Sequence, residues 1–165
     1  MSMLAPASAQ DDAKPRCDEL PSYHLLDFWV GDWNVYVGDE QVGHNRIERA
    51  LHGCAIFEHW AGRGGNEGKS LFFVSDDGTW KQVWVTEWAN RPGGVKEKAM
   101  IDIAPGEGVR FQGKLQHPDV GEWPDRTTLK PLENGAVRQL VETSADNGNT
   151  WKTTFDAIYR RANAN

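Results

Sequence analysis

The residues best suited to chemistry lie on stretches where aromatic and polar side chains alternate. Successive side chains of a β-strand point to opposite faces, so a strand over 79–88 would place one mixed set on a single face: Trp80, Gln82, Trp84, Thr86 and Trp88. Ligand pockets combine aromatic walls with a few polar groups. We therefore expect this face to line a cavity, and the alternative is that the indoles fill a solid core or cover the outside.

The same alternation on two other stretches adds charged groups. Glu58 shares a face with Trp60, and Arg138 shares a face with Glu142. If Glu58, Arg138 and Glu142 face inward, they must be mutually paired, because an unpaired buried charge is costly. Such a network would either bind a polar ligand group or only stabilise the fold. The expected ligand-binding residues are Glu58, Trp60, Gln82, Trp84, Arg138, Glu142 and Tyr159.

Catalytic patterns are weak in this chain. The histidines have neither H-x-H nor H-E-x-x-H spacing, and no Gly-x-Ser-x-Gly is present, so we expect no metal and no other cofactor. His24 could act as a general base if it neighboured Glu58 or Glu142. A lone histidine is more often a structural hydrogen-bonding group, which leaves His24 and Glu58 as the only catalytic candidates.

Length and charge exclude several classes of protein. The chain has 165 residues and a net charge of −6, which suits one domain. It has no cluster of basic residues, so we do not expect a nucleic-acid partner. It also has no apolar run of about 18 residues, the length that a membrane-spanning helix requires.

The N-terminal region contains features of export. Ala7-Ser8-Ala9 follows the small-x-small pattern of a secretory cleavage site, so residues 1–21 are interpreted as a signal remnant and an irregular lead-in. An ordinary disordered terminus is the alternative. In a periplasmic or secreted protein, Cys17 and Cys54 would form one disulfide worth about 4 kcal/mol in the chain-entropy treatment. Otherwise they are two unrelated buried thiols.

The rest of the chain predicts an all-β domain over 22–161, followed by a tail over 162–165. Pro21 and the apolar residues that follow predict a short N-terminal helix over 22–29. Turn sequences then separate about ten alternating stretches, which we place at 32–38, 42–52, 54–62, 69–75, 79–88, 95–104, 108–116, 125–132, 136–145 and 150–160. Hairpin-length connections favour an antiparallel meander, and closure into a barrel of about 8–10 strands removes its edges. A sandwich is the alternative.

One turn follows a specific pattern. Residues 144–151 match S-x-D-x-G-x-T-W, the Asp box, a β-hairpin motif that recurs in sialidases and other secreted proteins. Asp146 can bond the turn backbone, Gly148 accepts a positive φ, and Trp151 can cap the hairpin. We assign these three residues a structural role.

The stretch Gly31-Asp32-Trp33, directly after the expected helix, resembles the first-strand motif of the calycins, the lipocalin and fatty-acid-binding barrels. That resemblance implies that Trp33 plugs the closed end of a barrel, with Arg160 or Arg161 of the last strand stacked over it. Over 24–160 the chain is similar to exported bacterial proteins of unassigned function that share the motif DFWxGxWxV, here residues 27–35. The resemblance implies a calycin-like barrel and no particular chemistry.

Together these features predict an exported, tryptophan-rich barrel that binds a small apolar or aromatic molecule. The first alternative is a cofactor-free lyase or isomerase acting on a small hydrophobic substrate in the lumen, with His24 or Glu58 as the acid or base. The second is a carbohydrate-binding β-domain whose exposed indoles stack on sugar rings.

Overall fold

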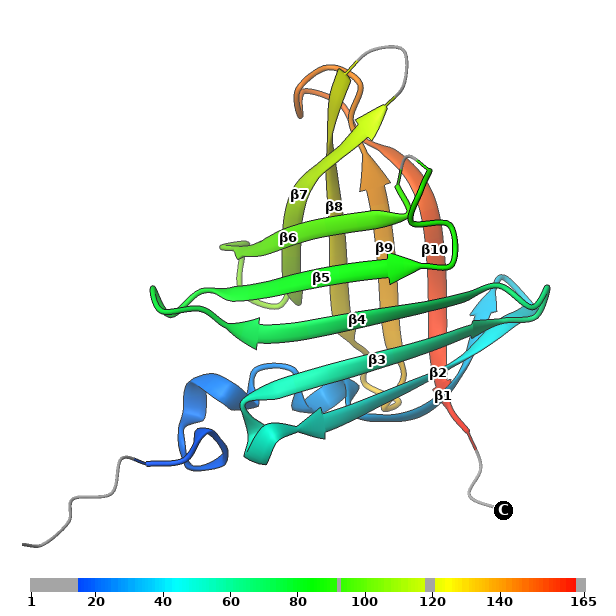
Figure 1. The fold of residues 1–165 in the computed structure, drawn as a ribbon. Coiled ribbons are helices and arrows are strands. Elements are labelled where there is room, and N and C mark those ends of the chain that lie inside the picture. The colour runs from blue at the N-terminus through cyan, green and yellow to red at the C-terminus, as the bar shows by residue number, and fades with distance from the viewer. Residues whose placement is uncertain (1–14, 92, 118–120, 163–165) are drawn as a thin grey trace, which may run out of the picture.

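Ten antiparallel strands form a closed barrel in the computed structural model, which describes residues 15–91, 93–117 and 121–162. Each strand pairs with its neighbours in sequence, and the first pairs with the last (Figure 1). The strands are β1 (Gly31–Val37), β2 (Glu40–Ala50), β3 (Ala55–Gly62), β4 (Glu67–Val74), β5 (Trp80–Thr86), β6 (Val95–Ile101), β7 (Val109–His117), β8 (Gly121–Pro131), β9 (Val137–Thr143) and β10 (Lys152–Arg161). The expected all-β antiparallel barrel is confirmed.

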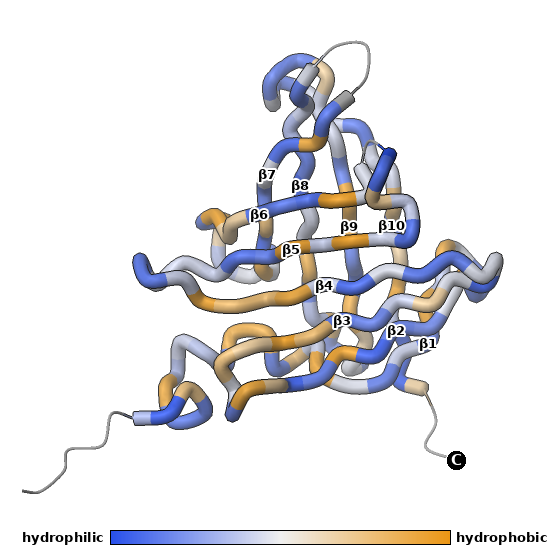
Figure 2. The backbone as a smooth tube through the Cα atoms, in the orientation of Figure 1, coloured by the Kyte–Doolittle hydropathy of each residue, from blue (hydrophilic) through white to orange (hydrophobic). Residues whose placement is uncertain are grey.

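Alternation along the strands explains why these segments form a barrel wall. In β1, Trp33 and Val35 are buried while the residues between and beside them are not. Hydrophobic and hydrophilic positions follow one another at short intervals along most strands (Figure 2). A strand with one apolar face buries that face against the interior and leaves the other in water.

The N-terminal segment forms short 3₁₀ turns in place of the single helix expected over 22–29. They are η1 (Cys17–Glu19), η2 (Pro21–His24) and η3 (Asp27–Trp29), and a fourth, η4 (Leu51–Gly53), links β2 to β3. Leu26 and Trp29 are fully buried and belong to the apolar core. This segment therefore closes one end of the barrel.

A disulfide between Cys17 and Cys54 joins the N-terminal segment to the start of β3. The expected pairing of the two cysteines is confirmed, and it fixes η1 beside η4. The cleavage-site pattern at residues 7–9 lies outside the described residues, as do residues 163–165 of the expected tail.

The closed end is organised around Trp33. This side chain is fully buried, and its Nε1 donates a hydrogen bond to the carbonyl oxygen of Trp29 at 2.8 Å. The guanidinium carbon of Arg161 lies 3.9 Å from the centre of the indole ring, and its Nη1 donates to the carbonyl oxygen of Val30 at 2.7 Å. Arg160 instead lies over Tyr36 at 4.4 Å. Arg161 is thus the arginine of the last strand that covers Trp33.

Gly31 is required at this contact for two reasons. Its φ is +141°, a conformation that residues with a side chain rarely adopt. A Cβ at this position would also overlap the guanidinium of Arg161. The glycine of the Gly-x-Trp pattern therefore makes room for the arginine that covers the tryptophan.

We expect Gly31→Ala to destabilise the protein by about 3 kcal/mol or more, because backbone strain and displacement of Arg161 add. Gly38→Ala is the matched control: Gly38 also has a positive φ, +60°, but a Cβ there meets nothing within 4 Å. The control should cost about 1 kcal/mol. Denaturant unfolding measures both, and equal losses would contradict the role given to the Arg161 contact.

Candidate functional site

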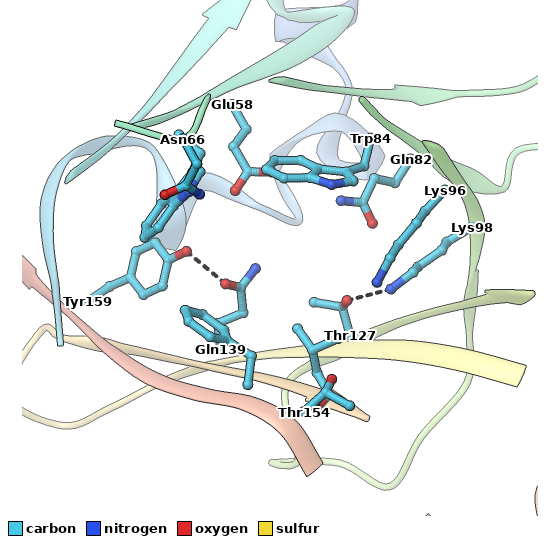
Figure 3. Close-up of a pocket in the computed structure, with 13 residues that line it drawn as sticks. Glu58, Asn66, Gln82, Trp84, Lys96, Lys98, Thr127, Gln139, Thr154 and Tyr159 are labelled. Carbon is cyan, nitrogen blue, oxygen red and sulfur yellow. Dashed lines mark hydrogen bonds between the residues drawn. The ribbon is translucent and has the colours of Figure 1, made fainter. Parts of the chain in front are cut away.

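A cavity of about 330 Å³ occupies part of the barrel interior, away from the end that Trp29 and Trp33 fill. Its volume lies in the range of small-molecule sites in proteins. Figure 3 shows its lining side chains converging from several strands. The lining residues are Glu58, Trp60, Asn66, Gln82, Trp84, Lys96, Lys98, Thr127, Gln139, Val141, Thr154, Phe155 and Tyr159.

The walls of the cavity are aromatic. Trp60 meets Phe155 edge to face, with ring centroids 6.3 Å apart, and Trp84 lies on β5. Each indole has a glycine beside it on the preceding strand: a Cβ on Gly43 would overlap the ring of Trp60, and a Cβ on Gly68 would overlap the ring of Trp84. The two glycines let the rings lie close against the sheet, which leaves the space between them open.

Glu58 lines the cavity, with only 3% of its surface exposed. Its Oε1 accepts a hydrogen bond from Asn45 Nδ2 at 2.7 Å, and its Oε2 accepts one from Ser70 Oγ at 2.6 Å. Burial raises the pKa of this carboxyl, and the hydrogen bonds from Ser70 and Asn45 together with the charge of Lys98 only partly oppose the rise. Glu58 is therefore a carboxyl whose environment favours the protonated form.

The hydrogen-bond network continues on both sides of Glu58. Gln82 Nε2 donates to Ser70 Oγ at 3.1 Å, and Tyr159 accepts from Asn45 at 3.1 Å and donates to Gln139 Oε1 at 2.7 Å. Burial, followed by the nearby carboxyl of Glu58, raises the pKa of Tyr159, so its hydroxyl acts as a donor. Among the described residues nothing donates to Gln82 Oε1, a buried acceptor in the lining of the cavity.

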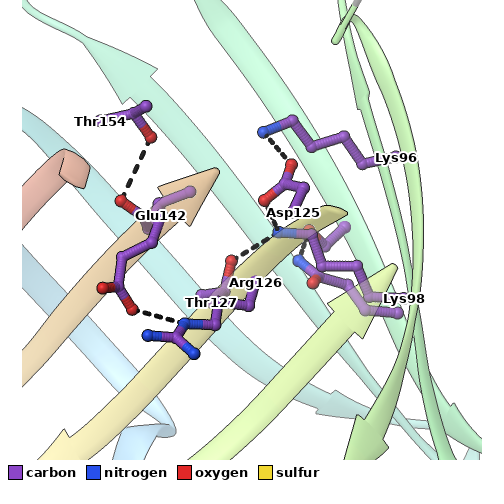
Figure 4. A network of polar contacts seen from close by, with 10 residues as sticks. Lys96, Lys98, Asp125, Arg126, Thr127, Glu142 and Thr154 are labelled. Atoms are coloured by element: carbon purple, nitrogen blue, oxygen red, sulfur yellow. Dashed lines mark hydrogen bonds and ion pairs between the residues drawn. The ribbon is translucent and has the colours of Figure 1, made fainter. Parts of the chain in front are cut away.

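A second polar cluster, formed by Lys96, Lys98, Asp125 and Thr127, lies on β6 and β8 (Figures 3 and 4). Lys98 Nζ donates to Asp125 Oδ1 and to Thr127 Oγ1, each at 2.7 Å. Lys96 Nζ lies 2.6 Å from the other oxygen of Asp125. Burial and the neighbouring charge of Lys96 lower the pKa of Lys98 to about 8, although Asp125 opposes the change. An amine with this pKa is partly neutral near physiological pH.

Five of the seven residues expected to bind a ligand lie around this cavity, and two do not. The five are Glu58, Trp60, Gln82, Trp84 and Tyr159. Arg138 lies on the outer face, where its Nε and Nη2 form a bidentate ion pair with the carboxylate of Asp156, each at 2.7 Å. Glu142 pairs at 2.7 Å with Arg126.

The expected inward network of Glu58, Arg138 and Glu142 is therefore not formed. On β9, Gln139 and Val141 line the cavity, and strand alternation turns their neighbours outward. Glu142 is nonetheless buried, because Arg126 lies over the ring of Trp151 at 3.8 Å and covers that part of the outer face.

The structure does not bring His24 together with Glu58 or Glu142. His24 Nδ1 lies 2.7 Å from Asp27 Oδ2, and its Nε2 lies 3.0 Å from the carbonyl oxygen of Asp18. These contacts tie together turns of the N-terminal segment, and His24 does not line the cavity.

Sequence reasoning missed the lysine cluster. Lys96 and Lys98 alternate with Glu97, so β6 resembles an exposed strand, and lysine is rarely buried. A signal did exist on β8, where Asp125, Thr127 and Leu129 share one face and all three are buried. A carboxylate that shares a face with a core leucine needs a cation nearby.

The Asp-box turn contributes to the fold and not to the cavity. Asp146 accepts hydrogen bonds from Ser144 Oγ at 2.8 Å and from the backbone and side chain of Thr150 at 2.7 and 2.6 Å. These bonds, those from Thr150 first, lower the pKa of Asp146 to about 2. Trp151 Nε1 donates to the carbonyl oxygen of Gly148 at 3.1 Å.

Within residues 15–91, 93–117 and 121–162, no three His, Cys, Asp or Glu side chains gather closely enough to hold a metal ion. None of the helices in those ranges is long and apolar enough to cross a membrane.

No family model matches the sequence, and no curated protein matches it. The closed barrel of ten antiparallel strands fits a calycin-like fold.

We expect Glu58 to make stability fall as pH rises. The folded-state pKa is raised above the ordinary value of 4.5, so the contribution of Glu58 is fully present below that pH and is lost as pH rises through the folded-state pKa. Glu58→Gln keeps the size and shape of the side chain and removes the titrating carboxyl group. Denaturant unfolding at a series of pH values should show the variant gaining stability relative to the parent above pH 4.5.

Glu97→Gln on the exposed face of β6 is the control, and it should follow the parent profile. A Glu58→Gln profile parallel to that of the parent protein would show that burial does not hold this carboxyl in its protonated form.

Proposed function

We propose that this protein is an exported barrel that binds a small apolar or aromatic molecule carrying one polar group. One observation carries the proposal: a cavity of about 330 Å³ is kept open between aromatic walls in a barrel whose other end is filled. Because Gly43 and Gly68 have no side chain, the two indoles lie against the sheet and do not narrow the cavity.

The chemistry of the walls selects the ligand. Trp60, Trp84 and Phe155 offer apolar surface, and burial of apolar area contributes about 25 cal/mol for each Å². Gln82 Oε1 is an acceptor without a protein donor among the described residues, and Lys98 lies beside it on β6. A ligand that combines a ring or short apolar body with a polar end matches both parts.

The proposed location outside the cytoplasm is supported by the Cys17–Cys54 disulfide. Structural disulfides form and persist in oxidising compartments and are rare in the reducing cytosol. The bond closes a loop of 37 residue steps, and loss of such a loop constraint costs about 4 kcal/mol.

Binding is favoured over the two alternatives. For acid and base catalysis, both oxygens of Glu58 already accept hydrogen bonds, and His24 lies outside the cavity. For carbohydrate binding, the indoles do not form one outer platform. Of the eight tryptophans, Trp88 alone is largely exposed, and Trp123 is half-buried. Trp29, Trp33 and Trp80 are buried, Trp60 and Trp84 line the cavity, and Trp151 lies under Arg126.

Titration of tryptophan fluorescence with a panel of cuminyl alcohol, indole, naphthol and lauric acid tests the proposal. At least one compound should bind saturably, and Trp84→Ala should weaken that binding about tenfold or more, because one wall of the cavity is removed. Trp88→Ala is the matched control, since Trp88 is 53% exposed and does not line the cavity. Native mass spectrometry of freshly purified protein searches for a ligand carried through purification.

If no compound of the panel binds and no ligand is found after purification, the proposal fails. Equal effects of Trp84→Ala and Trp88→Ala would place binding outside the cavity.

The glycine beside Trp84 gives a further prediction. We expect Gly68→Ala to push the indole into the cavity and to weaken ligand binding severalfold while the protein stays folded. Gly64→Ala is the control, because its Cβ would come no closer than 3.8 Å to any other group. Isothermal titration with the compound that binds most tightly measures both variants, and unchanged affinity in Gly68→Ala would argue against the cavity as the binding site.

A further inference from the structure

We infer that the side-chain amine of Lys98 forms a reversible imine with an apolar or aromatic aldehyde or ketone held in the cavity. This inference rests on the proposed function, because the carbonyl compound must first occupy the lumen. It goes beyond that function by assigning covalent chemistry to one lining residue.

Lys98 is positioned to reach the cavity. Lys98 is 5% exposed, it extends from β6, and its ammonium nitrogen lies at the cavity beside Thr127 (Figure 3). Lys98 pairs with Gly113 of the neighbouring strand β7, where a Cβ would overlap the backbone carbonyl of Glu97 and come within 3.2 Å of Lys98 Cγ. Because Lys98 lines the cavity and bonds Thr127 in the same lining, its amine is directed to the lumen.

The environment of Lys98 favours the neutral, nucleophilic amine. An amine attacks a carbonyl only when it is neutral, and two conditions make a lysine neutral near physiological pH: a desolvated site and a neighbouring cation. Lys98 meets both, because it is buried and because Lys96 binds the same carboxylate. Its pKa of about 8 reflects these two causes against the opposing charge of Asp125.

Asp125 allows Lys98 to give up its proton without leaving a lone buried charge. This carboxylate is 1% exposed, and the nitrogen of Lys96 lies 2.6 Å from one of its oxygens. When Lys98 is neutral, Lys96 still balances Asp125. When the imine is protonated, Asp125 lies next to the positive nitrogen and stabilises it.

The reaction balances without a cofactor. The nitrogen of neutral Lys98 bonds to the carbonyl carbon, and one amine proton passes to the carbonyl oxygen to give a carbinolamine. The second amine proton leaves with that oxygen as one water, and the carbon–nitrogen double bond forms. Thr127 Oγ, 2.7 Å from the nitrogen, is placed to hydrogen-bond the carbinolamine hydroxyl.

The cavity walls define the carbonyl compound. Trp60, Trp84 and Phe155 favour an aromatic or branched apolar body, and the reacting carbon must lie toward β6. Cuminaldehyde, an aromatic aldehyde with an isopropyl group, is therefore a suitable probe. Cuminyl alcohol has the same body without the carbonyl group.

The test is reductive trapping. The protein is incubated with cuminaldehyde and sodium cyanoborohydride, and intact mass spectrometry follows the product. We expect one adduct, with a mass gain equal to that of the aldehyde less one oxygen atom, and peptide mapping should place it on Lys98. Excess cuminyl alcohol should suppress it by competition for the cavity.

Variants separate the cavity amine from other amines. Lys98→Arg keeps the charge beside Asp125 but cannot form the imine, so the adduct should be lost. Lys114→Met, which removes a lysine on the outside of the barrel that pairs with Glu122, should leave the adduct unchanged. If Lys98→Arg does not fold, the mapped position in the parent protein decides the question alone.

An adduct on Lys96, on other lysines or on the N-terminal amine would overturn the inference, as would no adduct at all. If cuminyl alcohol binds while cuminaldehyde gives no adduct at Lys98, the imine fails and the proposed function stands. If neither compound binds or reacts, the imine fails, and the wider titration panel decides the proposed function separately.

Discussion

The pairing of β1 with β10 is the contact on which the rest of the structure depends. Without it the ten-stranded sheet would have two open edges and no enclosed interior. Contacts of Arg161 reinforce this pairing. Its guanidinium lies over Trp33 and donates a hydrogen bond to the carbonyl oxygen of Val30. It occupies the space that a side chain at Gly31 would fill. A cation over an indole contributes about 0.5 to 2 kcal/mol. The Trp33 contact thus both closes the barrel and fills the end opposite the cavity.

A closed barrel places every second side chain in a common interior, and here the polar ones occupy a middle layer. One hydrogen-bonded chain links side chains of six strands, β2 to β5, β9 and β10. Its members are Asn45, Glu58, Ser70, Gln82, Gln139 and Tyr159. Buried polar groups are tolerated when most of them satisfy one another, and of the buried side-chain atoms in this hydrogen-bonded chain only Asn45 Oδ1 and Gln82 Oε1 lack a partner among the described residues. This layer divides the packed apolar end from the open aromatic end. Because Trp60 and Trp84 lie against Gly43 and Gly68, a cavity remains between the aromatic rings on the open side of the polar layer.

The fold could be predicted from sequence more fully than the site. Turn residues and alternation locate all ten strands, because each hairpin turn needs its own backbone chemistry. Which face of a strand points inward is harder, since it depends on register, and a shift of one residue reverses it. On β5, Trp84 and Gln82 share one face, and this mixture of an aromatic and a polar side chain correctly predicts the face that lines the cavity. On β9 both faces carry apolar and polar residues, with Val137 and Gln139 on one and Arg138 and Leu140 on the other. Nothing in that pattern shows that Arg138 faces outward.

The two polar clusters of the cavity differ in what they leave for a ligand. Around Glu58, both carboxyl oxygens and the Tyr159 hydroxyl are already occupied by partners in the barrel wall. The charged ammonium of Lys98 has three N–H donors, and it makes two hydrogen bonds to described residues, Asp125 and Thr127. These two bonds leave its third donor unaccounted for among the described residues. Gln82 Oε1 lies on the strand next to Lys98 and lacks a protein donor. In the proposed binding mode, the polar end of a ligand lies at the β5 to β6 side of the cavity, and its apolar body extends toward Trp60 and Phe155. In this proposed orientation Glu58 stabilises the cavity wall, and Lys98 is the group that would contact the ligand.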